Sequence, residues 1–426
     1  MTVGTDKGSA VVEPQEVAVE LDMTTDLDSF RAANPVFTAS GCAAAGRELH
    51  QFFDVAELGG VVTKSVMMRP RAGRPTPRMA ETPSGMLNSI GLQGPGIEAF
   101  CDHDLPWLAE RGAKAVVSIA GGHVEDYRML AHRLRDQPGV AMIEVNISCP
   151  NVEDRGQVFA CDPWEASRVI RAVRGELAGR VPLFAKLSPD VTDIVEIAKA
   201  CVDAGADGLS MINTLLGMAI DTDTMRPQLG GVTGGLSGPA IRPVAVRCVW
   251  QVHQALPYIP ILGMGGIMTG RDALEFILAG ASAVSVGTAV FHDPSAPVRV
   301  LAELRQALLE RGFTRLQDAI GYAHRPADPV RSRESVTVAE SAAEPDTASD
   351  AEPKTAADDQ RTEPVQADRG EAPELDAAAV AAAGELADDM SDGEAMADAG
   401  LADVTTDVDA DAAERPAVEK TSPRRI

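Results

Sequence analysis

The chain has 426 residues and a formal net charge of −25, and this charge is unevenly distributed. Residues 326–426 hold 26 acidic and 9 basic residues, a net of −17, whereas the rest of the chain has a net of −8. Such acidity argues against nucleic acid as a partner. No run of about 18 apolar residues and no basic start followed by an apolar run occurs, so neither a membrane span nor a secretory signal is expected.

The composition predicts three regions. No Phe, Tyr or Trp follows Tyr322, and residues 326–426 are rich in Ala, Asp, Glu, Pro, Ser and Thr. Such a segment buries too little apolar surface to offset its ordering entropy, so it is predicted to be a disordered acidic tail. Residues 1–30 are acidic and poor in aromatic residues, and they are predicted to be a flexible extension. Residues 31–325 remain as one globular domain of the size of a barrel.

Eight β-rich runs recur along this domain, and helical patterns follow most of them. This alternation predicts a parallel sheet with right-handed crossovers, for which a closed (β/α)8 TIM barrel is the simplest arrangement. A doubly wound open sheet is the alternative, but no GxGxxG follows the first strand. The eight runs span residues 34–40, 59–66, 115–121, 141–148, 182–188, 205–214, 259–266 and 281–288.

Polar residues and glycines collect at the carboxyl ends of these runs, where the chemistry of a barrel takes place. Three glycine-bearing stretches, 234–240, 263–267 and 286–289, predict a site for the phosphate of a cofactor, because glycines let backbone N–H groups approach closely. The residues at the eight ends are Ser40, Lys64 with Ser65, Ser118, Asn146 with Cys149, Lys186, Asn213 with Thr214, Gly265 with Gly266, and Gly287 with Thr288.

Two lysines in the barrel mouth restrict the class of ligand. A buried lysine such as Lys64 or Lys186 needs an anion or an electron-rich ring beside it. A flavin fits this need, and so does a phosphorylated sugar. A lysine that forms a Schiff base in an aldolase is a further alternative. Four carboxamides favour a small heterocycle with amide edges and a carboxylate, and they are Asn88, Asn146, Asn151 and Asn213.

Four motifs together resemble the dihydroorotate dehydrogenases, in order from about Asn34 to about Gly321. They are NISCPN (146–151), ETPSGMLNSIGLQGPG (81–96), MINTLLGM (211–218) and GGLSGPAIRPVAVR (234–247). The stretch RAGRPTPRMAETPSGMLNSIGLQ (71–93) is most similar to the catalytic subunit of class 1, subclass B. The membrane-bound class carries a serine base, whereas this chain has Cys149.

The resemblance implies a barrel that holds FMN and oxidises dihydroorotate to orotate in pyrimidine synthesis. Cys149 matches the base that takes the proton from ring carbon 5, while hydride passes from carbon 6 to the flavin. The positions that match substrate contacts are Lys64, Asn88, Ser89, Ile90, Gly91, Leu92, Asn146, Asn151, Asn213 and Thr214. Those that match FMN contacts are Ser40, Lys64, Ser65, Asn146, Lys186, Ile212, Gly238, Gly265, Gly266, Gly287 and Thr288.

One position departs from the family pattern. Ser118 stands where the family usually has an asparagine that contacts FMN, and its shorter hydroxyl needs a water to reach the flavin.

Segment 152–163 is predicted to be a lid. His123 is an alternative base and Cys161 a second thiol near the lid, although an ordinary surface histidine and an inert cysteine are the favoured interpretations.

The resemblance also implies a partner. The six cysteines are scattered without a CxxC pair, so the sequence predicts a reduced cytoplasmic compartment and neither a metal nor an iron–sulfur site. In subclass B a second polypeptide with FAD and a [2Fe–2S] cluster passes electrons to NAD+, and two barrels pair within a heterotetramer. The alternatives are a dihydropyrimidine dehydrogenase-like barrel, a fumarate-using class 1 enzyme, and a binding protein that recruits a partner through its tail.

Overall fold

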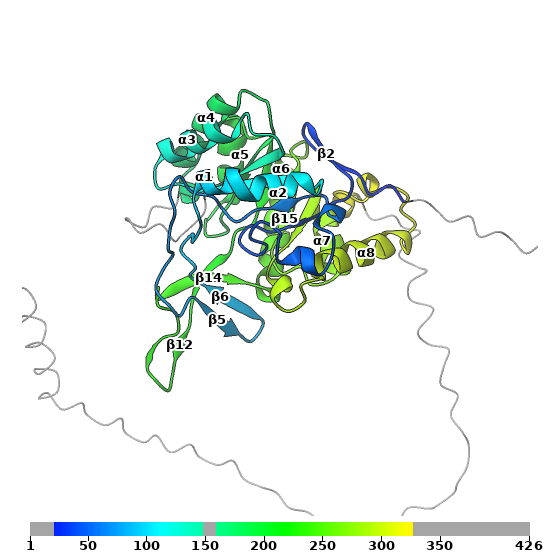
Figure 1. The fold of residues 1–426 in the computed structure, drawn as a ribbon. Coiled ribbons are helices and arrows are strands. Elements are labelled where there is room, and N and C mark those ends of the chain that lie inside the picture. Colours follow the sequence, from blue (N-terminus) through cyan, green and yellow to red (C-terminus); the bar gives the residue numbers. More distant parts are fainter. Residues whose placement is uncertain (1–20, 148–158, 327–426) are drawn as a thin grey trace, which may run out of the picture. The chain divides into compact units, whose positions relative to one another are not determined.

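The computed structural model describes residues 21–147 and 159–326 (Figure 1). All described residues belong to one compact unit. The predicted acidic tail lies outside the described residues beyond Pro326, as does the part of the flexible extension before Leu21.

The barrel consists of eight parallel strands, and each predicted run overlaps one of them. They are β3 (Val36–Thr38), β4 (Val61–Val62), β7 (Ala115–Ile119), β8 (Val140–Asn146), β9 (Leu183–Lys186), β10 (Gly208–Met211), β15 (Ile261–Met264) and β16 (Ala283–Val286). Hydrogen-bonded neighbours follow the order β3-β16-β15-β10-β9-β8-β7-β4. The predicted (β/α)8 fold is therefore confirmed.

The ring closes between β3 and β4 through two glycines. The Gly59 N–H donates to the Val36 carbonyl at 2.8 Å, and the Thr38 hydroxyl accepts from the Val62 N–H at 2.9 Å. A Cβ on Gly60 would lie 2.7 Å from the Phe37 ring. Only glycine lets the backbone pass this ring so closely.

Helices cover the outside of the barrel, but the first crossover differs from the expected pattern. Between β3 and β4 the chain forms only short 3₁₀ turns, Leu49–Gln51 and Val55–Glu57, instead of an α-helix. The helices that follow are α1 (Ile97–Ala99), α2 (Leu105–Glu110) with a π turn between them (Phe100–Asp104), α3 (Val124–Leu134), α4 (Pro163–Leu177), α5 (Ile194–Asp203), α6 (Arg242–Ala255), α7 (Gly270–Ala279) and α8 (Ala296–Leu309).

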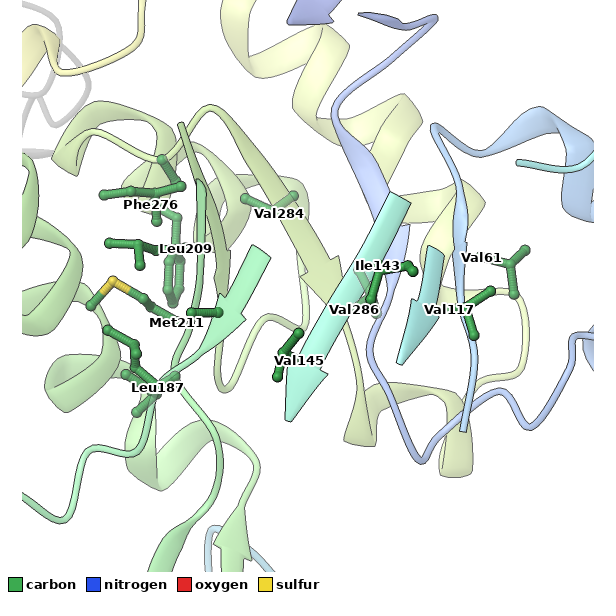
Figure 2. Packing of buried hydrophobic residues seen from close by; sticks show 14 of the residues in the cluster. Val61, Val117, Ile143, Val145, Leu187, Leu209, Met211, Phe276, Val284 and Val286 are labelled. Atoms are coloured by element: carbon green, nitrogen blue, oxygen red, sulfur yellow. The ribbon is translucent and has the colours of Figure 1, made fainter. Parts of the chain in front are cut away.

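Alternate strand residues face the helices and form the main core. Figure 2 shows side chains of this cluster, among them Val117, Ile143, Val145 and Leu209, each fully buried. Because successive residues of a strand point to opposite faces, the residues between them face the barrel interior.

The interior has an apolar lower layer that an N-terminal hairpin closes. The hairpin strands β1 (Thr25–Leu27) and β2 (Phe30–Ala32) pack Leu27 and Ala32 against interior residues that include Val116, Met142 and Phe184. The prediction of a flexible segment up to residue 30 is therefore wrong for residues 21–30. Composition missed this hairpin, because a few apolar side chains suffice to plug the barrel.

Two residues further along the strands, the interior becomes polar. The side chains of this level form the floor of the site described below, and we call them the polar floor. They are Ser118, Glu144, Lys186, Ser210 and Ser285, together with Met264, and all are buried.

A four-stranded antiparallel sheet stands at the carboxyl side of the barrel (Figure 1). It is built from the segments that follow β4 and β10, and the sequence patterns did not predict it. Its order is β11-β14-β6-β5, and a two-stranded ribbon, β12 with β13, extends from it. The bounds are β5 (Met79–Thr82), β6 (Gly85–Asn88), β11 (Leu215–Met218), β12 (Ile220–Asp221), β13 (Arg226–Pro227) and β14 (Thr233–Ser237).

In the two described segments, no helix is both long and apolar enough to cross a bilayer. Within the same segments no cluster of three His, Cys, Asp or Glu residues has the geometry of a metal site.

Candidate active site

Two adjoining clefts open at the carboxyl ends of the barrel strands, and Asn213 and Thr214 line both. The glycine cleft contains about 530 Å³ of empty space, and its lining includes Ser40, Lys186, Ile212, Gly238, Gly265, Gly266, Gly287 and Thr288. The mouth cleft contains about 1060 Å³, and its lining includes Lys64, Ser65, Asn88, Ile90, Gly91, Leu92 and Asn146.

Part of the wall of the glycine cleft is glycine backbone. Gly265 and Gly266 follow β15 with φ of 131° and 79°, a region that disfavours other residues. A Cβ on Gly266 would lie 2.7 Å from the Gly238 carbonyl oxygen, and a Cβ on Gly238 would lie 2.7 Å from the Gly85 Cα. The loops after β14 and β15 therefore touch, and only glycines leave room between them.

Lys186 brings a positive charge to the floor of the glycine cleft. Its side chain is 4% exposed, and its ammonium lies 3.5 Å from the carboxylate of Glu144, which is fully buried. Neighbouring strands deliver the two residues, since β8 and β9 pair in register over this stretch. A buried ion pair therefore lies at the floor of the cleft. The sequence interpretation had identified Lys186 as a site residue but not Glu144.

A chain of hydrogen bonds crosses the bottom of the mouth cleft. The Ser118 and Ser65 hydroxyls are 2.9 Å apart, and the Asn146 amide donates to Ser65 at 3.0 Å. The Asn213 Nδ2 donates to the Asn146 side-chain Oδ1 at 3.4 Å, and the Thr214 backbone N–H donates to the Asn213 Oδ1 at 2.9 Å. Each link fixes the orientation of the next polar group.

Arginines hold the loop at the rim of the mouth cleft. The Arg71 guanidinium donates to the Gly91 carbonyl at 2.9 Å, and the backbone N–H of Arg74 donates to the Ile90 carbonyl at 3.0 Å. Gly91 and Leu92 have φ of 77° and 56°. The arginine-rich stretch before β5 therefore supports the loop that presents Asn88 to the cleft.

Most sequence-predicted site residues lie in these clefts, and two described residues do not. Ser118 belongs to the polar floor and reaches the mouth cleft only through Ser65. Ser89 is fully buried beside Arg74, whose guanidinium lies 3.4 Å from its hydroxyl. Asn88 and Ser89 are neighbours in extended backbone, so their side chains point to opposite faces.

Cys149 and Asn151 lie outside the described residues, as does most of the predicted lid. The ends of this segment are joined, because the Ala160 N–H donates to the Ile147 carbonyl at 3.0 Å. Cys149 follows Asn146 by three residues, so the chain leaves β8 at the mouth cleft just before it.

The alternative site residues lie elsewhere. His123 is exposed at the start of α3, and it lines neither cleft. Cys161 is exposed with its thiol 3.7 Å from the Asp190 carbonyl, and partial burial raises its pKa.

Sequence interpretation missed several residues that line the clefts. Cys42 and Ser237 line both, and Met264 and Ser285 line the glycine cleft. Burial raises the pKa of the Cys42 thiol to about 11 despite the opposing influence of Lys64 and Lys186. The alternation of side chains along a strand was the available signal for Ser285, because it lies on β16 two residues before the predicted site residue Gly287.

Fold and site together define a class. A (β/α)8 barrel whose strand ends form a glycine-lined cleft joined to an amide-lined cleft has the architecture of a barrel enzyme that binds a phosphorylated ligand beside a polar substrate.

Comparison with known proteins identifies the family. The family model for dihydroorotate dehydrogenase matches residues 23–308. Two catalytic subunits of dihydroorotate dehydrogenase B (NAD(+)) are similar to this chain. That of Geobacter sp. (strain M21) is 51% identical over 300 residues, which cover 70% of this chain and 97% of that protein. That of Desulforudis audaxviator is 54% identical over 292 residues, which cover 68% and 94%.

A solved structure agrees. DHODH from Eimeria tenella, in complex with ferulenol, superposes with a TM-score of 0.61 at 25% identity, over 74% of this chain and 92% of that one. The chain belongs to the dihydroorotate dehydrogenase family.

Proposed function

We propose that this chain is the catalytic subunit of an NAD+-linked dihydroorotate dehydrogenase, which oxidises (S)-dihydroorotate to orotate in pyrimidine biosynthesis. The observation that carries the proposal is the meeting of the two clefts at Asn213 and Thr214, in a chain about half identical to catalytic subunits over nearly their whole length. The proposed catalytic domain is the barrel, followed by an acidic tail from residue 326, and the scattered cysteines favour the cytoplasm as its location.

The glycine cleft fits FMN. Its glycines leave a backbone cradle of the kind that receives a phosphate, and Lys186 supplies a cation on its floor. Ser285 has a buried hydroxyl without a partner among the described residues, and it lines this cleft. When bound, FMN supplies the two-electron acceptor for the hydride that leaves carbon 6 of the substrate.

The residues proposed to hold FMN come from both clefts. Ser40, Ile212, Gly238, Gly265, Gly266, Gly287 and Thr288 form the wall of the glycine cleft, Lys186 lies on its floor, and Lys64, Ser65 and Asn146 approach from the mouth cleft.

The mouth cleft fits dihydroorotate, a flat ring with amide edges and a carboxylate. Asn88, Asn146 and Asn213 offer paired donors and acceptors. Lys64 supplies a cation on the same cleft, and the arginine-supported loop closes its rim. Thr214 and the loop residues Ile90, Gly91 and Leu92 complete the described part of the proposed substrate site, and Asn151 is proposed to join them.

Proton transfer requires a positioned base, and we assign this role to Cys149. In the sequence it follows Asn146, one of the proposed substrate amides, by three residues. A thiol has a pKa of about 8.5 in water, so the site must favour the thiolate for it to take the proton from carbon 5.

The electron acceptor requires a second protein. The relatives are named as catalytic subunits of NAD(+)-linked enzymes. We propose that a partner with FAD and a [2Fe–2S] cluster carries electrons to NAD+, and that two barrels pair within this heterotetramer.

The test uses the purified chain with dihydroorotate. Anaerobic mixing should bleach bound flavin, whereas NADH should form only after the partner subunit is added. Absence of bleaching contradicts the activity, and NADH formation by the chain alone contradicts the partner requirement. Rapid turnover with fumarate, or reduction of uracil in place of dihydroorotate oxidation, indicates one of the two alternative enzymes.

A further inference from the structure

Glu144 is the only fully buried carboxylate in the part of the chain that the structure describes. It lies on β8, where Ile143 and Val145 face the helices and Glu144 faces the barrel interior. One carboxylate oxygen lies 3.5 Å from the Lys186 ammonium. The other has no hydrogen-bond partner among the described residues.

Stability alone does not explain such a residue. Removing a carboxylate from water costs several kcal/mol, and replacing a buried ion pair with neutral groups is often neutral or stabilising. The neighbours of Glu144 across the strands are Ser118 and Phe184, and neither adds a charge. A buried charge that is poorly satisfied and lies beneath a cleft points to function.

Only one member of the Glu144–Lys186 ion pair can contact a ligand in the glycine cleft. Lys186 lines the glycine cleft, whereas Glu144 does not and lies beneath that cleft in the polar floor. A ligand in the cleft therefore contacts the lysine, and the carboxylate acts on the ligand through the lysine. Because one of its oxygens has no hydrogen-bond partner among the described residues, Glu144 holds Lys186 through electrostatic attraction more than through a complete set of hydrogen bonds.

We propose that Glu144 is a positioning residue that holds the Lys186 ammonium at the floor of the glycine cleft and offsets its charge toward the bound flavin. This inference rests on the proposed FMN site. Reduction gives the flavin ring negative charge, which an uncompensated lysine would stabilise further. Glu144 therefore keeps the reduction potential of the flavin lower than Lys186 alone would set it.

The test is a redox titration of the flavin in Glu144→Gln, which keeps the shape of the side chain and removes its charge. Its midpoint potential should move to a more positive value than that of the wild type. Glu310→Gln, an exposed position at the end of α8, is the matched control and should leave the potential unchanged. An unshifted potential in Glu144→Gln would overturn the proposal.

Glu144→Asp keeps the negative charge, but its shorter side chain places the carboxylate further from the Lys186 ammonium. It should leave the potential near the wild-type value and weaken FMN binding several-fold, as measured by the release of flavin on dilution. If Glu144→Gln does not fold, this variant decides, because wild-type potential together with wild-type affinity would overturn the proposal.

The titration uses a chemical reductant and no dihydroorotate, so it is independent of the dehydrogenase activity. A wild-type chain that binds FMN but does not oxidise dihydroorotate contradicts the proposed function alone. A wild-type chain that binds no FMN contradicts the cofactor assignment and this inference together.

Discussion

The two clefts are built from different materials. Four glycines line the glycine cleft, and at three of them, Gly238, Gly265 and Gly266, an added Cβ would collide with a neighbouring atom. The mouth cleft is mainly side chains, with carboxamides linked through Ser65 and a loop held by arginines. A backbone wall suits a phosphate that every member of a cofactor class shares, whereas oriented side chains suit the recognition of one particular ring.

This difference predicts opposite sensitivities. The glycine cleft should be damaged by added atoms and lose the cofactor. The mouth cleft should be damaged by removed atoms and lose reaction or substrate while it keeps the cofactor.

The largest effect is expected from Cys149→Ala. Removing the general base should slow flavin reduction by dihydroorotate by about 10²–10⁴-fold. FMN should stay bound, because the described residues that line the glycine cleft are unchanged in this variant. Stopped-flow bleaching of the flavin measures the rate, and the absorbance of the purified protein measures the bound FMN.

Cys149→Ser is the matched variant. A hydroxyl is a much weaker acid than a thiol, so a small residual rate should remain and increase with pH. Reduction of Cys149→Ala at the wild-type rate would show that another group takes the proton.

Gly266→Ala should cause the next largest effect. The new Cβ would lie 2.7 Å from the Gly238 carbonyl and 2.9 Å from the Arg242 Cβ, in backbone with φ of 79°. FMN affinity should fall by about tenfold or more, which corresponds to ~1.4 kcal/mol. Fluorescence of the released flavin provides the measurement.

Gly175→Ala is its control, because no atom lies within 4 Å of the added Cβ and the site is inside α4. This control should hold FMN like the wild type. If both variants do so, the wall of the cleft is not the phosphate cradle.

The sequence predicted the elements that depend on long apolar runs and missed those that do not. Each barrel strand is buried on both faces, so it appears as a continuous apolar run. The antiparallel sheet was missed because its strands mix glycine, polar and exposed residues, as in Met79–Thr82. The hairpin that includes Leu27 was missed because its surroundings are acidic.

The site was predictable where motifs or glycines marked it, and less so where three-dimensional packing decides. Ser89 was grouped with Asn88, although extended backbone turns neighbouring side chains apart. Glu144 was overlooked, although it lies two residues before Asn146 and therefore faces the same interior. Its pairing with Lys186 depends on the register of β8 and β9, which no local pattern reveals.

Ser118→Ala tests whether the buried hydrogen bond between Ser118 and Ser65 helps to orient Asn146 in the mouth cleft. The change removes one hydrogen bond to Ser65, which should cost ~1 kcal/mol and raise the KM for dihydroorotate about five-fold. Ser210→Ala is the matched control, since its buried hydroxyl has no partner among the described residues. Equal KM values for the two variants would indicate that the hydroxyl chain does not orient Asn146.

The smallest effect is expected from removing the acidic tail after Pro326. The described lining of both clefts extends only as far as Phe291, so the clefts should be complete without the tail. The last turn before it does pack, because the His324 ring stacks on Trp250 with centroids 3.6 Å apart and its Nε2 lies 3.0 Å from the Ala279 carbonyl.

Truncation after Pro326 should therefore shift the Tm by less than about 2 °C and leave FMN content and KM unchanged. Truncation after Ile320 removes the packed turn and should lower the Tm by several degrees, which makes it the positive control. Differential scanning fluorimetry of the two shortened chains separates the cases. A loss of FMN in the variant truncated after Pro326 would show that the glycine cleft depends on residues beyond the barrel. A raised KM in the same variant would show this for the mouth cleft.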